Sequence, residues 1–147
     1  MSINNGQDEI QAWLSDINPS LVLNNGVCNF EEPSLNVEVG ISVNKSNGLI
    51  TFYSPMITLN EDNKAFLLEK AMLTNSDGNK MDGCWLSLID NEILLSHVRE
   101  IDTFDQISLA NIIDNFTFKS HEIKKELSLQ VDFNKPIENH LTHGILV

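Results

Sequence analysis

The feature that most constrains the fold is a strict alternation of apolar and polar side chains from Leu35 to Val43. Successive side chains of a β-strand point to opposite faces of a sheet, so this run predicts a strand with one apolar face. Asn47-Gly48 follows, a pair that tolerates positive φ and is typical of hairpin turns. The next apolar run, Leu49–Ser54, is expected to stop at Pro55, which has no N–H for a ladder bond. The pattern therefore predicts an antiparallel hairpin.

Helical periodicity surrounds this hairpin on both sides. Gln7–Ile17 repeats apolar side chains at i, i+3, i+4 and i+7, which predicts an amphipathic helix. A second helix is expected to begin at Asn60 as its N-cap, and a third at the capping box Thr103-Phe104-Asp105-Gln106, continuing to about Leu127. Further strands are expected at Val27–Glu31, Cys84–Ile89 and Ile93–Val98.

The expected order is helix, three strands, helix, two strands, helix, which predicts a single α+β domain with an antiparallel sheet covered by helices. This domain is expected to span residues 1–129 of the 147 in the chain, and residues 130–147 are expected to form a C-terminal tail.

Charge narrows the range of partners. Nine basic against 21 acidic side chains give a formal net charge of −12. A field of that sign repels phosphate backbones and anionic lipids, so neither nucleic acid nor a membrane is an expected partner. The N-terminus lacks the pattern of a signal peptide, and no apolar run approaches the ~20 residues of a spanning helix. We therefore expect a cytoplasmic protein.

Few residues have the chemistry of a catalytic or metal site. Cys28 and Cys84 lie in apolar runs and are expected to be buried free thiols, although one disulfide between them stays open. His140 and His143 could share a metal, but two ligands fall short of the three or four of a zinc site. His97 is expected to be structural. No phosphate loop, dinucleotide fingerprint or nucleophile motif is present, so we expect no cofactor, no metal and no enzymatic activity.

The supply of apolar side chains is large for the number of elements. Leu49–Tyr53 is partly apolar on both faces, and the helix after Asn60 has a broad apolar stripe. Such a surplus either forms an exposed patch that marks a partner surface or belongs to an ordinary core. The sequence leaves both readings open.

Three passages resemble the class I chaperones of bacterial type III secretion, the Tir-chaperone family, over about residues 7–127. They are the paired strands LNVEVGISVNKSNGLITFYSPM, the helix NEDNKAFLLEKAML and the run GCWLSLIDNEILLSHVREIDTFDQISLANIIDNF. The resemblance implies a homodimeric, cytoplasmic chaperone that binds the N-terminal segment of a secreted effector in extended form and keeps it secretion-competent. It implies no cofactor.

The resemblance also implies two sets of site residues. The homodimer is expected to meet through the second helix and the fourth and fifth strands, at Leu67, Leu68, Ala71, Met72, Trp85 and Leu88. The effector segment is expected to contact the first helix and first three strands, at Trp13, Leu14, Phe30, Val37, Val39, Ile50, Phe52 and Tyr53.

Two alternatives belong to other classes. An acidic immunity or inhibitor protein would bind one folded basic toxin through charge, so that its complex would weaken in salt. A small-molecule-binding or enzymatic domain would need a deep pocket with convergent polar groups.

Overall fold

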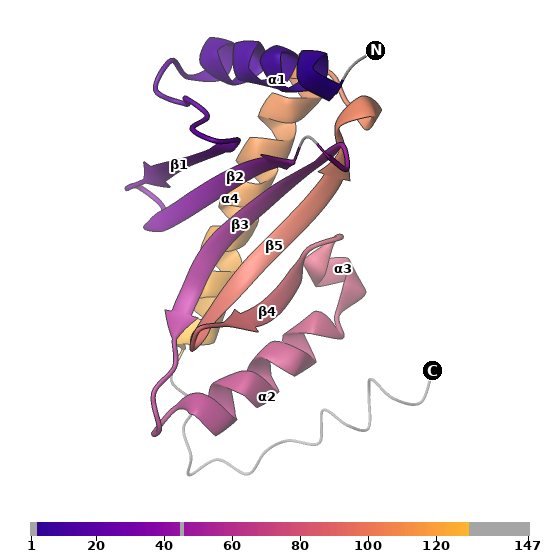
Figure 1. The fold of residues 1–147 in the computed structure, drawn as a ribbon. Coiled ribbons are helices and arrows are strands. Elements are labelled where there is room, and N and C mark those ends of the chain that lie inside the picture. Colours follow the sequence, from indigo (N-terminus) through magenta and orange to yellow (C-terminus); the bar gives the residue numbers. More distant parts are fainter. Residues whose placement is uncertain (1–2, 45, 130–147) are drawn as a thin grey trace.

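The computed structural model describes residues 3–44 and 46–129 as one α+β domain built on a five-stranded antiparallel sheet (Figure 1). The strands lie in the order β1-β2-β3-β5-β4, and every neighbouring pair is antiparallel. The α+β fold expected from the sequence is therefore confirmed. In chain order the elements are α1 (Ile3–Ile17), β1 (Val27–Glu32), β2 (Val37–Asn44), β3 (Leu49–Thr58), α2 (Lys64–Asn75), α3 (Gly78–Met81), β4 (Trp85–Ile89), β5 (Glu92–Glu100), the 3₁₀ turn η1 (Ile101–Thr103) and α4 (Gln106–Ser128).

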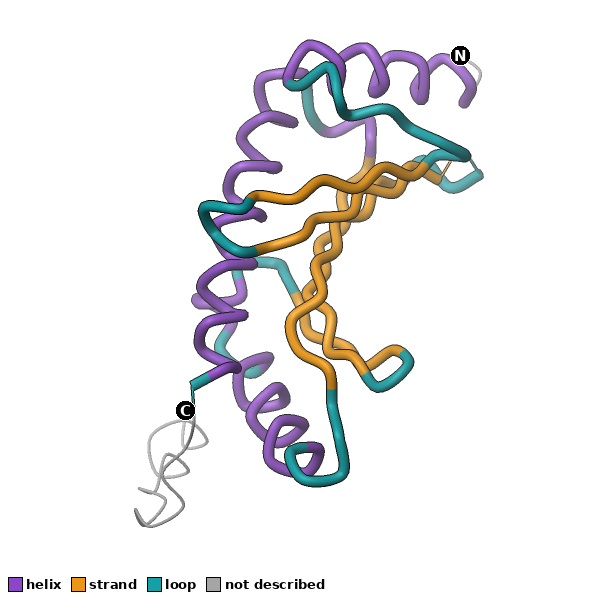
Figure 2. Tube along the Cα trace, turned by 90° about the vertical axis from the view of Figure 1, so that its left-hand side faces the viewer, coloured by secondary structure: helices purple, strands orange, loops and turns teal. Residues whose placement is uncertain are grey.

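The helices cover one face of the sheet. α4 packs along β3 and β2, and α1 packs on α4 at one end of the molecule. Figure 2 shows the helices on one side of the twisted sheet, and no helix of the described chain lies along the other side. The strand residues that face α4 form the core, and β2 shows the pattern clearly. Its buried side chains alternate with exposed or half-buried ones, apart from Gly40.

A two-residue turn joins β4 to β5. Ile89 pairs with Glu92, which leaves Asp90 and Asn91 as the turn, and both have positive φ, at 50° and 61°. Two consecutive residues of positive φ are the signature of a type I′ turn, whose twist matches that of the strands it joins. Aspartate and asparagine tolerate this backbone better than other non-glycine residues do.

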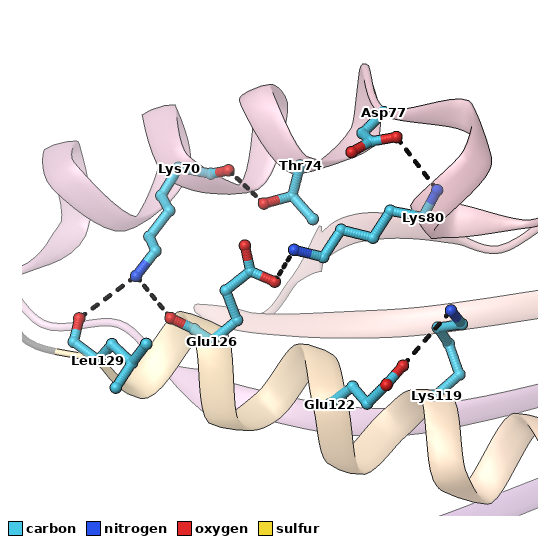
Figure 3. Close-up of polar contacts among 8 residues, drawn as sticks. All are labelled: Lys70, Thr74, Asp77, Lys80, Lys119, Glu122, Glu126 and Leu129. Atoms are coloured by element: carbon cyan, nitrogen blue, oxygen red, sulfur yellow. Dashed lines mark hydrogen bonds and ion pairs between the residues drawn. The ribbon is translucent and has the colours of Figure 1, made fainter. Parts of the chain in front are cut away.

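Polar contacts fix the second helix to the end of the last one (Figure 3). The Lys70 ammonium donates to the carbonyl oxygens of Glu126 at 2.5 Å and Leu129 at 3.3 Å, at the C-terminal end of α4. Lys80, from α3, forms an ion pair with the Glu126 carboxylate. Since only Leu67, Ala71 and Thr74 of α2 are buried, these contacts help to set where the helix lies.

Several expected boundaries were wrong. α1 begins at Ile3 rather than Gln7, and α2 begins at Lys64 rather than beside Asn60. The Asn60 side chain instead accepts from the N–H groups of Asp62 and Asn63, so it forms a turn before the helix. The short helix α3 was not expected at all.

The third strand does not end at Pro55. β3 continues to Thr58, and Pro55 pairs with Leu94 of β5. Beyond Tyr53 the β2 side of β3 has no strand partner, so a missing N–H leaves no ladder bond broken there. The register with β5 shifts between Pro55 and Ile57, which is where an irregular residue is tolerated.

Candidate functional site

Most of the side chains expected to contact a partner segment are buried within the protomer itself. The strand residues among them lie on the sheet face that α4 covers, and the one helix residue lies on the buried side of α1. Phe52 and Val39 are fully buried, for example, and contribute to the core. The buried members of the set are Leu14, Val37, Val39, Ile50 and Phe52. These residues shape the scaffold, and a partner contact by them stays a prediction.

Three members of that set keep part of their surface. Trp13 lies on α1 against the core, with its ring centroid 6.3 Å from that of Phe104. Phe30 lies on the edge strand β1, and it pairs with Val39. Tyr53 lies on the face of the sheet that no described helix covers, with its hydroxyl 3.5 Å from the Asn29 side-chain oxygen. Burial raises the pKa of this hydroxyl above its usual value, with smaller contributions from Cys28 and Glu38.

The helix residues expected at a dimer contact differ in exposure. Leu67 and Ala71 are buried in the protomer, and Leu68 is partly buried against the core. Met72 is 74% exposed. Leu73 was not among the expected residues, but it is also exposed. Only its position next to Met72 in the sequence could have indicated that Leu73 belongs to the same exposed surface.

The two strand residues of that set are both exposed. Trp85 and Leu88 lie on opposite faces of β4, because Trp85 pairs with Ser96 and Leu88 with Ile93. β4 is an edge strand of the sheet. Because Trp85 and Leu88 are exposed on its two faces, this edge has apolar surface on both sides. Ile89 on β4 and Val98 on β5 are exposed too, and sequence reasoning missed them. We call Met72, Leu73, Trp85, Leu88 and Ile89 the α2–β4 patch.

A half-open pocket of ≈ 610 Å³ lies between β5, α4 and the turn before β4. Its polar lining includes His97 and Arg99 from the strand and Lys119 and Glu122 from the helix. Phe116 and Phe118 supply much of its apolar lining. None of these residues was expected at a site. The only sequence pattern that pointed to this pocket was His97 and Arg99, which are two residues apart and so share one face of a strand. That pattern does not show which residues of α4 lie opposite them.

The pocket also contains a thiol. Cys84 lies just before β4 and is half-buried, so the expectation of a fully buried residue holds only for Cys28. Burial raises the pKa of the Cys84 thiol to about 11, with Lys119 lowering and Asp82 raising it to smaller extents. A thiol with this pKa is protonated near neutral pH and is a poor nucleophile. Both cysteines are free, which closes the disulfide alternative.

The polar groups of the pocket are held by their surroundings. The His97 ring Nδ1 donates to the Gly83 carbonyl oxygen at 3.2 Å, which gives this histidine a structural partner. Lys119 and Glu122 form an ion pair of 3.5 Å within α4 (Figure 3). Among the described residues, no three His, Cys, Asp or Glu side chains come together as a metal site. His140 and His143 lie outside the described residues. The arrangement has the chemistry of a binding surface.

None of the helices that the structure describes is long and apolar enough to span a membrane.

Comparison with known proteins gives one family. The family model described as the Tir chaperone protein (CesT) family matches residues 14–123. No curated protein sequence matches the chain. The match confirms the family resemblance expected from the sequence.

Solved structures with a similar fold include chains from three complexes. One is the HopA1-SchA chaperone-effector complex, with 13% identity, a TM-score of 0.61, and coverage of 83% of this chain and 97% of that chain. The second is the ExsC-ExsE complex, with 11% identity, a TM-score of 0.67, and coverage of 86% of this chain and 97% of that chain. The third is the heterodimeric ExoU-SpcU complex from the type III secretion system of Pseudomonas aeruginosa. Here the identity is 13%, the TM-score is 0.62, and the match covers 80% of this chain and 93% of that chain. At these identities the likeness concerns the fold.

Proposed function

Since the chain belongs to the Tir chaperone protein (CesT) family, we propose that it is a bacterial cytoplasmic chaperone for a type III secretion effector. It binds the N-terminal segment of that effector in extended form, keeps it soluble and secretion-competent, and does so as a homodimer without catalysis. The observation that carries the proposal is the family match, which covers most of the described domain.

The similar structures support this reading through their fold. The HopA1-SchA structure is described as a chaperone-effector complex, and this chain covers nearly all of the chain it matches there. The proposal takes from that structure only the expectation that the shared scaffold serves the same kind of task.

The sheet of this chain suits an extended client in two ways. Within the described residues its edge strand β1 has a strand partner on one side only, so beyond the Asn24–Val27 bridge its other edge offers backbone donors and acceptors to an added strand. Phe30 on β1 and Tyr53 on the uncovered face offer half-buried aromatic surface for alternate client side chains. Trp13 offers a third half-buried aromatic ring, on α1. These three residues are the client contacts that we propose from the expected set.

The α2–β4 patch is the dimer contact that we propose. It places exposed apolar side chains on a helix and on both faces of an edge strand, where a solvated monomer would leave them in water. Leu67, Leu68 and Ala71 then support the helix from behind. A two-fold contact doubles every client-binding surface, which suits a partner that wraps around the chaperone.

The test is a complex with the N-terminal segment of a candidate effector, encoded beside this chain's gene and expressed with it. We expect a complex with two copies of this chain, in which proton chemical shifts of the client lack the dispersion of a folded domain. Tyr53→Glu and Phe30→Glu, each with an unchanged dimer mass, are expected to weaken it. A wild-type chain that holds no such segment contradicts the proposal.

The acidic immunity protein remains the competing class, and salt separates the two. A complex that rests on apolar contacts and added strand pairing persists as ionic strength rises, whereas one steered by net charge weakens steeply. Dissociation in moderate salt, together with a client that is folded when bound, would favour the immunity protein.

A further inference from the structure

The pocket between β5 and α4 differs from the rest of the molecule in charge. The chain as a whole has 21 acidic and nine basic side chains. Here Arg99, His97 and Lys119 line a single pocket. The pocket also contains two carboxylates: that of Glu122 pairs with Lys119, and that of Asp82 lies in the turn before β4. Arg99 and Lys119 therefore balance the acidic side chains here, in a protein whose overall charge is strongly negative.

Arg99 supplies the second positive charge of this pocket, and solvent reaches its polar atoms. Its guanidinium carries five N–H donors in a planar fork that matches a carboxylate. Across residues 3–44 and 46–129, no side chain forms an ion pair or hydrogen bond with it. Arg99 is nevertheless half-buried and lies in the pocket lining. Its donors are therefore available to a group that enters from outside.

The lining also has an apolar part. Ile112 and Phe116 line the pocket one turn apart on α4, and so does Phe118, which is 55% exposed. A volume of ≈ 610 Å³ is far larger than one small anion needs and is within the range of pockets that hold several ligand groups. The occupant that fits has one negative group for Arg99 and an apolar group for the phenylalanines.

We propose that this pocket selects the client sequence: it receives an acidic side chain of the extended segment, together with an apolar side chain two residues along. In an extended chain, residues i and i+2 point to the same side, so both can enter one pocket. The carboxylate binds the Arg99 guanidinium, and the apolar side chain packs on Phe116 and Phe118. This inference rests on the proposed function and adds a sequence preference to it.

Two short blocked peptides test the preference directly. The probe is acetyl-Ser-Glu-Ser-Leu-Ser-amide, and its match replaces Glu by Gln. We expect the Glu peptide to shift the backbone amide resonances of Gly83, His97, Arg99 and Phe118, and to bind about tenfold more tightly than the Gln peptide. Equal binding of the two peptides, or shifts confined to other residues, overturns the inference.

Variants separate the charged and apolar halves of the pocket. Arg99→Gln is expected to reduce affinity for the Glu peptide to that for the Gln peptide. Lys64→Gln, on the exposed start of α2, removes the same charge outside the pocket and is expected to leave both affinities unchanged. Phe118→Ser is expected to weaken both peptides alike, because both contain leucine. A loss with Lys64→Gln equal to that with Arg99→Gln would show a nonspecific effect of net charge and overturn the inference.

Three further outcomes are decisive. Inorganic phosphate that shifts the same amides with the affinity of the Glu peptide would make this a general anion site, against our inference. If the complete client binds Arg99→Gln as tightly as wild type, the pocket selects nothing while the chaperone function stands. If wild type holds no client segment at all but still prefers the Glu peptide, the function fails and the pocket chemistry remains.

Discussion

At the scale of single residues, Gly40 and Tyr53 approach each other closely on the uncovered face of the sheet. The two residues pair across β2 and β3, and the tyrosine ring lies over the glycine. A Cβ at position 40 would collide with the ring atoms Cζ and Cε2 and with the hydroxyl oxygen. A side chain larger than glycine here has to displace the ring.

We therefore predict that Gly40→Ala destabilises the fold by about 1–3 kcal/mol, the usual cost of overpacking. In a Tyr53→Ala background the same substitution should cost much less, because the colliding ring is gone. Urea unfolding of the four proteins in this cycle measures the coupling. Ser42→Ala, on the same face of β2, is the matched control with little expected effect. A cost that is equal in both backgrounds would contradict the contact.

The second prediction at this scale concerns the Cys84 thiol. Burial raises its pKa to about 11, so the reactive thiolate is rare at neutral pH. In a Cys28→Ala variant, alkylation by iodoacetamide should speed up about tenfold per pH unit from about pH 7 to about pH 9.5 without levelling. Mass spectrometry of the labelled fraction gives the rate.

An ordinary exposed thiol, with a pKa of about 8.5, would level off within that range. The same measurement on the urea-unfolded chain supplies this reference curve. Levelling in the folded protein would show that the environment of Cys84 is more polar than the pocket lining indicates. Binding of the client should slow the reaction further, because the thiol lies in the pocket that we assign to it.

At the scale of elements, the start of α4 shows where sequence reasoning chose the wrong residue. The expected capping box was Thr103-Phe104-Asp105-Gln106, but Thr103 belongs to η1 and donates its hydroxyl to the Glu100 carbonyl oxygen. The N-cap is Asp105, whose carboxylate accepts from the Ser108 N–H at 2.8 Å. Aspartate is a better N-cap than threonine, but the Thr-x-x-Gln spacing of a capping box favoured Thr103, so the motif misled where the residue type alone would have chosen Asp105.

This cap gives a pH-dependent prediction. Hydrogen bonds from the Ser108 N–H and hydroxyl hold the pKa of Asp105 below its usual value. A lowered folded-state pKa means that the charge stabilises the fold above the unfolded value of about 3.9 and that this stabilisation is lost as pH falls through the lower folded value. Asp105→Ala should therefore lower the urea midpoint at pH 7, and its difference from wild type should shrink in acid.

Two variants control for other causes. Asp105→Asn keeps an acceptor without the charge, so its urea midpoint should depend less on pH in this range than that of wild type. Thr103→Ala removes a hydrogen bond outside the helix and should not reproduce the pH dependence. If Thr103→Ala lowers the urea midpoint at pH 7 and Asp105→Ala does not, the expected capping box is right after all.

Periodicity predicted the elements well where it was long. The alternation around Val37–Asn44 and the helical spacing through α4 match the structure closely. Errors occurred where tertiary context decides, and Pro55 is the clearest case. Proline usually ends a strand, but here β3 has lost its β2 neighbour by that point and can continue. Nothing in the local sequence reveals where a neighbouring strand stops.

The candidate site was harder to predict than the fold. Alternation shows that Val37, Val39 and Ile50 share an apolar face, but not that α4 covers this face within the protomer. The pocket could not be predicted for a similar reason. Arg99 and Phe118 come together only because α4 packs beside β5, and the sequence does not show this packing. A site formed by residues of two elements depends on where the helix packs against the sheet, and sequence periodicity does not predict that position.

At the scale of the whole molecule, exposed apolar surface is unevenly distributed. α4 covers one face of the sheet, while α2 and β4, which contain the exposed residues of the α2–β4 patch, lie at the lower end of the molecule in Figure 1. Lys70 and Lys80 hold α2 and α3 against the end of α4, so Met72 and Leu73 are directed to solvent by a fixed helix and not by a loose one. A fixed apolar surface of this kind suits a two-fold contact better than it suits water.

The last prediction follows from that surface. Trp85 is 41% exposed on the edge strand, and Met72 is 74% exposed on α2. Across a two-fold axis each substitution is introduced twice, so Trp85→Asp or Met72→Asp buries two uncompensated carboxylates in an apolar contact. Light scattering with size-exclusion chromatography should give wild type twice the 16.5 kDa chain mass and give both variants the mass of one chain. Ile107→Asp makes a comparable change at a residue that is also 74% exposed, at the start of α4, and should stay dimeric. If Ile107→Asp alone separates the chains, the contact lies at the α1–α4 end of the molecule, and the α2–β4 patch is then free for the client.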